Sequence, residues 1–485
     1  MEDTFDVGII AKRSVKGVAA LVSRTFLIQI LSIVASFILT IYLDPKSFGI
    51  FFVVSSIIVF FNYFSDIGLA ASLIQKKETP TLVEYRNVFT VQQILVLILI
   101  IPALLCAPYI ANFYKLDTSG LYLLYAFFIS FLLSSLKTIP TVMLERHLKF
   151  EKLVIPQIVE NFFYNGALII FVVLGFGVNA FTIAVLLRGV VGLIATYIIQ
   201  PWRVGFAFSY PTVKSLMKFG VPFQMNSILA LFKDDLLAVF IAKILPLSAV
   251  GYIGFAQKWA FMPLRLIMDN VIKVTFPSFS RLQDDKKALS KIVEKSIFLI
   301  ALFIFPIVTG IIMFAPHLVE HIPDYQKWRP AVLALSLYSL NALVASVSVP
   351  LTNFLNAIGK IKITLYIMIF LTVGTWVSTL LLVMYFGYNG VALASFLVAA
   401  SGLVVIYFVK KYIQFSFIHQ VYKQLLASII MAGSVFIFQS FINSLWAIFV
   451  IGGVSVGVYG VIMVLLAKDE IINTFRFIMT SLKKS

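Results

Sequence analysis

Runs of about 20 predominantly apolar residues recur along the whole chain, separated by short polar segments. A helix needs a run of this length to cross the hydrocarbon core of a bilayer, because each residue advances it by only about 1.5 Å. Of the 485 residues, 61% are hydrophobic and only 12% are charged, too few charges for the surface of a soluble domain. The sequence therefore predicts an all-α integral membrane protein. We expect fourteen transmembrane helices, at residues 18–43, 48–74, 87–112, 120–144, 153–174, 179–200, 216–243, 248–276, 292–316, 330–356, 361–386, 389–409, 421–442 and 445–467.

The loops between these runs differ in their content of lysine and arginine. Basic residues gather in alternate loops and near both termini, whereas the intervening loops hold few of them. Cytoplasmic loops of membrane proteins carry this excess, so we expect both termini on the cytoplasmic side of the cell (inner) membrane. The net charge of +17 thus indicates membrane topology and contact with membrane lipids, and no nucleic-acid partner is expected.

An internal repeat divides the chain into two similar parts. Six predicted spans separate the matching segments, so the two parts run in parallel sense, as in some transporter folds. The matching pairs are 176–180 (FGVNA) with 386–390 (FGYNG), Gly192 with Gly402 and, more weakly, 45–49 with 246–251; Arg188 aligns with Val398. We expect an N-lobe at 1–205, a C-lobe at 206–415 and two additional helices at 416–485.

One predicted span carries a stripe of charge. At about 100° per residue, its charged residues Lys258, Arg265, Asp269 and Lys273 fall within an arc of roughly 80° on a helix. One interpretation is a structural network, because Arg265–Asp269 and Asp269–Lys273 have the i,i+4 spacing of ion pairs. The other is a binding face for an anionic substrate, because one Asp among three cations leaves net positive charge and Arg grips phosphate with two hydrogen bonds. We favour the binding face.

Further charged residues fall inside the predicted spans one to eight. Charge at membrane depth costs at least about 2.5 kcal/mol on insertion scales, so it faces protein or water and usually marks a pathway. Carboxylates there are candidates for ion coupling; for Asp234 and Asp235 the alternative is a salt bridge between the seventh and eighth spans. Lys137 is a candidate partner for Glu160. The candidate ion-coupling residues are Asp66, Glu160, Asp234, Asp235 and Asp269.

Signatures of enzymes and metal sites are weak. The segment at 317–321 (HLVEH) has the spacing of an inverted zinc-protease motif, but such a site needs a third, acidic ligand well downstream, and only Asp324 lies near. No glycine-rich loop followed by Gly-Lys-Ser/Thr occurs, and the single cysteine, Cys106, cannot form an intrachain disulfide. We therefore expect no catalytic residue, no metal and no cofactor, and predict that the chain is not an enzyme.

Short motifs in the first 300 residues, taken in order, resemble one family. They are residues 43–45 (LDP) with Phe48 and Gly49, 65–69 (SDIGL), 73–75 (LIQ), 113–114 (FY), 144–150 (LERHLKF), 216–220 (LMKFG), and Asp235 through 251–252 (GY) to 276–282 (FPSFSRL). In this order they are similar to Wzx-type polysaccharide flippases of the multidrug/oligosaccharidyl-lipid/polysaccharide (MOP) exporter superfamily.

The resemblance implies fourteen helices in two lobes around a central cationic cavity, with alternating access. The cavity of such proteins receives the pyrophosphate and sugars of a polyprenyl-linked oligosaccharide. Candidate protein partners are a polysaccharide polymerase and glycosyltransferases. Carried over to this chain, the residues that hold the head group are Arg24, Arg188, Lys258, Arg265 and Lys273.

The sequence thus predicts a flippase that moves lipid-linked oligosaccharide units from the cytoplasmic to the outer leaflet, coupled to a cation gradient. Two alternatives belong to the same superfamily, a multidrug-type cation antiporter and a peptidoglycan-precursor flippase. A drug exporter should present acids to cationic drugs, whereas the predicted cavity is cationic. Alternatives from another class are a membrane-embedded glycan-processing enzyme and a non-transporting scaffold.

Overall fold

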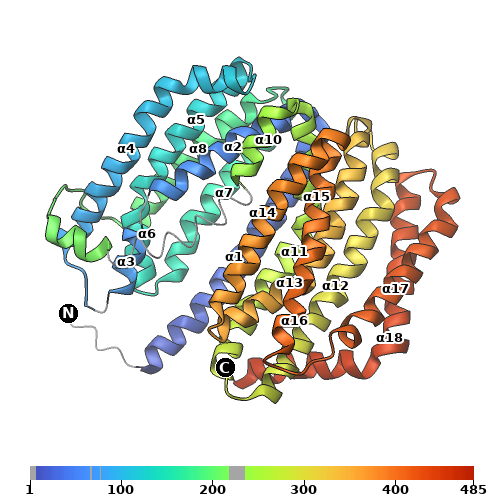
Figure 1. Cartoon of the computed structure of the whole chain (residues 1–485). Coiled ribbons are helices and arrows are strands. Elements are labelled where there is room, and N and C mark those ends of the chain that lie inside the picture. Colours follow the sequence, from blue (N-terminus) through green and yellow to red (C-terminus); the bar gives the residue numbers. More distant parts are fainter. Residues whose placement is uncertain (1–6, 66–67, 77, 218–234, 485) are drawn as a thin grey trace. The chain divides into compact units, whose positions relative to one another are not determined.

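The computed structural model describes residues 7–65, 68–76, 78–217 and 235–484, and within them every regular element is a helix (Figure 1). Twelve helices are long and apolar enough to cross a membrane among the residues described. The prediction of an all-α integral membrane protein is therefore confirmed. The count of fourteen stays a prediction, because most of the span at 216–243 lies outside the described residues and the span at 248–276, which is helical, is not among the twelve.

The chain divides into two compact units, residues 1–251 and 252–485. The first unit is a bundle whose long helices run side by side (Figure 1). Its helices are α1 (Val7–Tyr42), α2 (Pro45–Ser65), α3 (Leu69–Gln75), α4 (Leu82–Phe113), α5 (Thr118–Leu136), α6 (Thr138–Arg146), α7 (Phe150–Val173), α8 (Asn179–Ile199) and α10 (Asp235–Ile244), with a further helix at 210–217.

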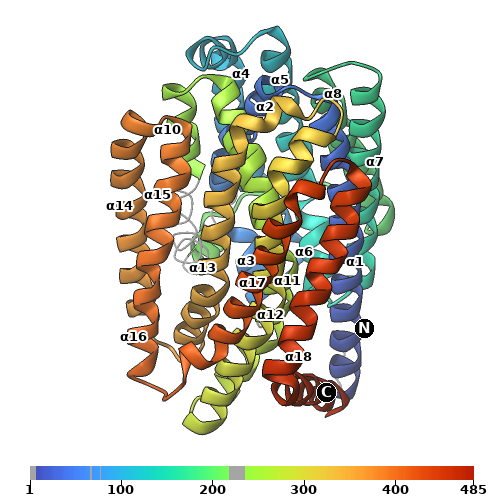
Figure 2. The ribbon, with the colours of Figure 1, turned by 90° about the vertical axis from the view of Figure 1, so that its right-hand side faces the viewer.

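The second unit is also a bundle, in which α12, α13 and α17 are neighbours (Figure 2). Its first helix, α11 (Leu247–Arg281), begins in the last residues of the first unit. The other helices are α12 (Lys286–His321), η1 (Gln326–Ala331), α13 (Val332–Ala357), α14 (Ile361–Phe386), α15 (Tyr388–Ser401), η2 (Gly402–Val404), α16 (Val405–Lys410), α17 (Phe417–Phe438), η3 (Gln439–Phe441) and α18 (Leu445–Lys484), which is kinked at Ala467. The predicted boundaries at 205 and 415 follow the sequence repeat and stay predictions.

Polar caps fix where several of these apolar helices begin. Thr81 accepts a hydrogen bond from the Glu84 amide at the start of α4, and the Glu84 side chain bonds back to the Thr81 amide. Asp117 accepts from the Gly120 amide at the start of α5, and Asp285 caps α12 in the same way. Each cap satisfies amide groups that the first turn of a helix leaves without partners.

Two predicted spans are interrupted. The span at 48–74 is divided into α2 and α3, because Gly68 has φ +82° and a right-handed helix cannot continue through that conformation. The span at 120–144 is divided into α5 and α6 at Lys137. Each interruption creates helix ends inside a predicted span. Lys137 lies at one of them, between α5 and α6.

The sequence repeat is visible in the backbone. Gly177 and Gly387, which occupy matching positions, have the same φ of +55°. The weaker pair of segments meets directly: a Cβ on Gly49 would lie 1.8 Å from the carbonyl oxygen of Leu247, and one on Gly251 would lie 1.8 Å from that of Pro45. Only glycine permits this reciprocal contact between α2 and the start of α11.

Candidate functional site

Glu160 of α7 lies at the centre of a group of charged side chains in the first unit. Its Oε2 atom is 2.6 Å from the Nζ atom of Lys137, and its Oε1 atom is 3.8 Å from an Nη atom of Arg188 on α8. The Glu160 and Lys137 side chains are only 12% and 17% exposed, whereas Arg188 is 46% exposed. The partnership that the sequence indicated for Lys137 and Glu160 is therefore confirmed, and Arg188 joins it.

Local structure brings the two ends of this ion pair together. Lys137 occupies the junction between α5 and α6, where one helix ends and the next begins. A Cβ on Gly192 of α8 would lie 2.3 Å from Glu160 Oε2 and 2.9 Å from Lys137 Nζ. Glycine at this position therefore leaves the space that the ion pair fills.

Arg188 has an aromatic neighbour as well as an acidic one. Its guanidinium carbon lies 5.4 Å from the centre of the Tyr164 ring, within the range of a cation–π contact. Tyr164 and Glu160 are four residues apart on α7, so they lie on the same face of that helix. One face of α7 thus provides both groups that hold Arg188.

Arg24 of α1 contacts the same helix one turn away. Its Nη1 atom donates to Gln157 Oε1 over 2.5 Å, and its Nη2 atom donates to Thr25 Oγ1 over 3.4 Å. The Arg24 Nε atom is buried without a hydrogen-bond partner. A guanidinium has five N–H donors, so Arg24 can still donate to a ligand. We call Arg24, Lys137, Gln157, Glu160 and Arg188 the charged cluster.

A cavity of about 320 Å³ adjoins the charged cluster. It is bordered by Lys137, Gln157 and Glu160, and four hydroxyl side chains and a second carboxylate complete its polar lining. These are Ser134, Thr138, Thr141, Thr196 and Glu145. A cavity of this size with several polar groups in its lining is large enough to hold water beside the cluster.

The other predicted site residues lie elsewhere or cannot be placed. Lys258 and Arg265 are exposed side chains of α11, whose uninterrupted helix contains all four positions of the predicted stripe. The side chains of Asp269 and Lys273 lie outside the described part of the structure, as do Asp66 and Asp234 entirely. Asp235 is the first residue of α10. The choice between a binding face and a structural network for the stripe therefore stays open.

Sequence reasoning missed Gln157, Tyr164 and Gly192. Gln157 precedes Glu160 by three residues, a spacing that places both on one helix face and could have indicated it. The sequence identifies Gly192 only as the residue that matches Gly402 in the internal repeat. No group of three or more His, Cys, Asp or Glu side chains in the described part of the chain is placed to hold a metal ion.

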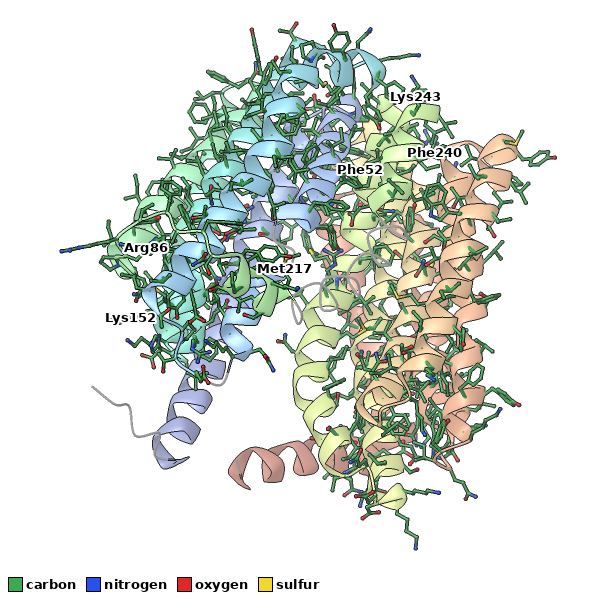
Figure 3. All side chains as sticks on the ribbon, turned by 60° about the vertical axis from the view of Figure 1, so that its left-hand side comes forward. Phe52, Arg86, Lys152, Met217, Phe240 and Lys243 are labelled. Carbon is green, nitrogen blue, oxygen red and sulfur yellow. The ribbon has the colours of Figure 1, made fainter. Side chains whose placement is uncertain are left out.

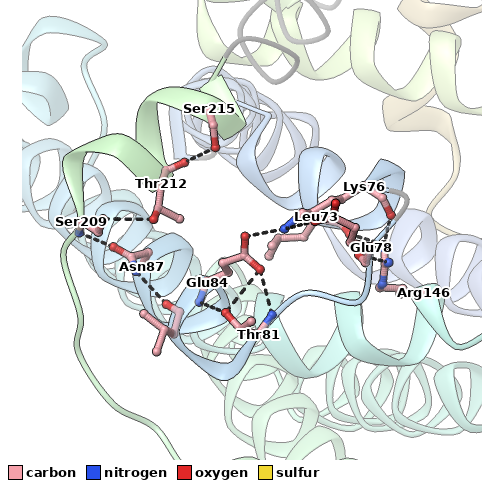
Figure 4. A network of polar contacts seen from close by, with 11 residues as sticks. Leu73, Lys76, Glu78, Thr81, Glu84, Asn87, Arg146, Ser209, Thr212 and Ser215 are labelled. Atoms are coloured by element: carbon pink, nitrogen blue, oxygen red, sulfur yellow. Dashed lines mark hydrogen bonds and ion pairs between the residues drawn. The ribbon is translucent and has the colours of Figure 1, made fainter. Parts of the chain in front are cut away.

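A second polar network lies near the loops of the first unit (Figure 4). Arg146, at the end of α6, donates to the carbonyl oxygens of Leu73, Ile74 and Lys76 over 2.7, 3.1 and 2.7 Å, and to that of Glu78 over 2.5 Å. These carbonyls belong to the end of α3 and the residues after it. Arg146 therefore caps α3 from another part of the chain. Two of the resembling motifs, 73–75 and 144–150, meet in this contact.

Comparisons with known proteins agree with the fold and with these motifs. A family model described as polysaccharide biosynthesis protein matches residues 38–333. The lipopolysaccharide biosynthesis protein WzxC of Escherichia coli (strain K12) is 24% identical over 377 residues, which cover 74% of this chain and 73% of WzxC.

Two solved structures share the fold. The lipid II flippase MurJ, in an inward closed conformation, matches with a TM-score of 0.74 at 17% identity, over 93% of this chain and 99% of the MurJ chain. A multidrug resistance MATE family transporter of the MOP superfamily, in an inward-facing conformation, matches with a TM-score of 0.63 at 17% identity, over 81% and 98% of the two chains. This chain therefore belongs to the polysaccharide biosynthesis protein family, whose model matches residues 38–333.

Proposed function

We propose that this flippase moves polyprenyl-pyrophosphate-linked oligosaccharide units from the cytoplasmic to the outer leaflet of the inner membrane, by alternating access coupled to a cation gradient. The observation that carries the proposal is the charge of the cluster, in which Lys137 and Arg188 pair with a single carboxylate, Glu160, and Arg24 adds a third cation bound to Gln157 one turn away. Positive charge inside the bilayer is costly, and an anionic head group would offset that cost.

The geometry of the cluster suits a phosphate-bearing head group. Arg188 is nearly half exposed and is held loosely by Glu160 at 3.8 Å, so its guanidinium is accessible to a ligand. Arg24 donates from one N–H of each Nη atom to Gln157 and Thr25, which leaves a second N–H on each for a ligand. Two guanidinium groups can each grip phosphate oxygens with paired hydrogen bonds. On α11 of the second unit, Lys258 and Arg265 are further exposed cationic side chains.

Glu160 supplies a means of coupling. Its carboxylate is balanced by Lys137 and Arg188, so a phosphate that binds either cation weakens the hold on Glu160. A carboxylate that loses a cationic partner can pair with another cation instead, and the adjoining cavity borders this carboxylate. Binding of the anion and uptake of the cation would then favour each other.

The alternative functions within the superfamily fit the cluster unequally. A multidrug-type antiporter needs acids for cationic drugs, whereas the cluster has three cations and one acid. A peptidoglycan-precursor flippase also handles an anionic lipid, so the cluster does not distinguish it from the proposal. Supplying each lipid-linked glycan in turn to vesicles containing the protein separates these two.

The alternatives from another class make different demands. A membrane-embedded glycan-processing enzyme would change the glycan itself, so purified protein in liposomes would release altered sugars. A non-transporting scaffold has no need for the cationic side chains, so Arg24→Leu with Arg188→Leu would support growth and glycan export fully. Either result would replace the transport proposal.

The direct test measures the appearance of the head group at the outer leaflet. We expect Arg24→Gln with Arg188→Gln to reduce it at least tenfold, because two head-group contacts are lost together. The matched control is Lys286→Gln with Lys287→Gln, which removes the same charge from exposed positions at the start of α12 and should leave flipping unchanged. Undiminished flipping by the first variant, at normal abundance in the membrane, would overturn the site.

A further inference from the structure

The strap, as we call it, follows α8 and consists of residues 201–209, which have no regular secondary structure, and Tyr210, the first residue of the helix at 210–217. Its side chains alternate between covered and exposed. From Val204 onward every even-numbered residue is exposed: Val204 49%, Phe206 72%, Phe208 64% and Tyr210 65%. The intervening residues, Gly205, Ala207 and Ser209, are partly buried. A period of two on an extended backbone places the four large apolar side chains on one edge.

The other edge of the strap is fastened to α4. The amide of Ala207 donates to Thr90 Oγ1 over 3.0 Å, and the amide of Ser209 donates to Asn87 Oδ1 over 2.5 Å, as Figure 4 shows for Ser209. A Cβ on Gly205 would lie 2.4 Å from Nε of Arg86, so glycine lets the strap rest on that side chain, which is labelled in Figure 3. The exposed edge is therefore held in place and is not a loosely placed loop.

The strap crosses a side of α4 that carries exposed apolar residues on both sides of the crossing. It contacts Asn87 and Thr90, and the same face of α4 continues one turn before them at Val83, which is 54% exposed, and one turn after them at Ile94, which is 46% exposed. Leu97 continues the row at 43%. Because α4 is apolar enough to span the membrane, exposed apolar side chains on this face are suited to contact lipid. Figure 1 shows the strap beside the lower half of α4.

We propose that the strap docks into the membrane interface, with the apolar edge inserted among the lipids and the nearby basic residues on anionic head groups. Tyrosine and other aromatic side chains suit this depth, where one side is apolar and the other wet. An extended backbone does not satisfy its own polar groups as a helix does, so the hydrocarbon core is excluded and the interface, with its water and head groups, is favoured.

Basic residues near the strap also favour lipid as the partner of its apolar edge. Arg203 is exposed near the start of the strap, and Lys214 is exposed one helical turn after its end, with its Nζ atom 5.8 Å from the centre of the Tyr210 ring. Basic residues beside apolar side chains are attracted to the anionic lipids of the cytoplasmic leaflet, where this loop is predicted to lie. The proposal concerns a surface outside the charged cluster and does not depend on which substrate the protein carries.

Site-directed spin labelling tests the depth of the strap. The single native cysteine is replaced by Cys106→Ser, and labels are attached in separate variants at Phe206→Cys and Phe208→Cys. The references are Ile98→Cys, which is exposed in the middle of the α4 span, and Glu78→Cys, which is exposed in a loop. In vesicles with anionic lipid we expect both strap labels to show a several-fold higher ratio of oxygen to nickel-chelate collisions than the Glu78→Cys label.

The possible outcomes decide the proposal. Strap labels that collide with the nickel chelate as often as the Glu78→Cys label would place the edge in water and overturn it. Protection that disappears, or spin–spin broadening that fades, when the protein is diluted in lipid would identify a second copy as the occupant and also overturn it. Protection that persists on dilution, and that weakens when Arg203→Gln and Lys214→Gln are added or when anionic lipid is omitted, supports docking on the membrane.

Discussion

The two halves of the repeat share a backbone and differ in chemistry. Gly192 in the first unit leaves space for the side chains of Glu160 and Lys137, whereas a Cβ on its counterpart Gly402 would meet only Leu371, at 3.5 Å. Arg188 lies against the Tyr164 ring, whereas Val398, which aligns with it, lies near Gly374. Tyr164 and Gly374 themselves stand in the same register. The same positions are therefore in contact in both units, but the charged and aromatic side chains of the first unit are replaced by apolar residues in the second.

The C-terminal ends of α6 and α13 allow the same comparison between the two units. In α6 and α13 the last turn closes with matching bonds, Lys149 N to Leu144 O at 2.9 Å and Lys360 N to Leu355 O at 2.8 Å. This match pairs Glu145 with Asn356 and Arg146 with Ala357. The second unit therefore closes the same helix end with no ionic side chain at the two positions that match Glu145 and Arg146. The two charged side chains are thus not needed to end the helix itself, and in the first unit Arg146 binds carbonyl groups of another segment.

The largest effect is expected from removing the central acid. Glu160→Gln leaves Lys137 and Arg188 without their counter-charge in a largely buried place, so we expect a loss of about 3 kcal/mol in the free energy of unfolding. The measurement is denaturant or thermal unfolding in detergent.

A second variant separates charge from packing at this position. Glu160→Leu with Lys137→Met imitates the apolar contact of Gly402 with Leu371 and should recover most of the lost stability while head-group flipping stays low. If the double variant is no more stable than Glu160→Gln, unpaired charge is not the cause of the loss.

The next effect concerns the contact between α6 and α3. Arg146→Ala, which installs the residue of the second unit, removes hydrogen bonds to four carbonyl groups, and we expect a loss of about 2 kcal/mol. Faster amide exchange in residues 73–78 should accompany it. Lys149→Ala, an exposed neighbour of the same charge, is the control. Equal losses in both variants would mean that the effect is one of net charge and not of the cap.

The glycine pair should give a smaller effect. A methyl group at Gly192→Ala must displace the ends of two flexible side chains, so we expect stability to change by less than about 1 kcal/mol while flipping falls several-fold. Gly402→Ala meets Leu371 at an ordinary contact distance and should preserve both properties. Assaying both variants for flipping tests the comparison, which fails if the two glycines tolerate alanine equally.

The sequence was sufficient for features that depend on local periodicity. The apolar runs predicted where the membrane helices lie. The spacing of the charged stripe predicted that its four positions share one helix, and all four lie in α11. The Lys137–Glu160 pair could be anticipated because charge inside a span needs a partner. The position of Gly68, where the second predicted span breaks, could have indicated the interruption but did not.

Contacts between distant parts of the chain were beyond sequence reasoning. Arg24 and Gln157 are 133 positions apart, and neither segment has a sequence pattern that indicates contact with the other. Arg146 binds backbone carbonyls, which every residue has, so its acceptors leave no trace in the sequence. The strap was missed for a similar reason, because its alternation has meaning only beside α4.

The smallest effect is expected at Glu145, where the second unit has Asn356. Burial raises the pKa of the Glu145 carboxyl above its ordinary 4.5, so the folded protein binds this proton more tightly than the unfolded chain does. The resulting stabilisation is fully present below the unfolded pKa and is lost as pH rises through the folded value. Glu145→Gln, which carries an amide as Asn356 does, should remove this contribution, so its melting temperature should fall less than that of the wild type between pH 4.5 and pH 7.

Melting curves at the two pH values give the comparison, with Glu320→Gln, an exposed acid near the end of α12, as the control. An unchanged difference in Glu145→Gln would show that the acid is solvated in the folded state, and the adjoining cavity would then be open to bulk water at that end.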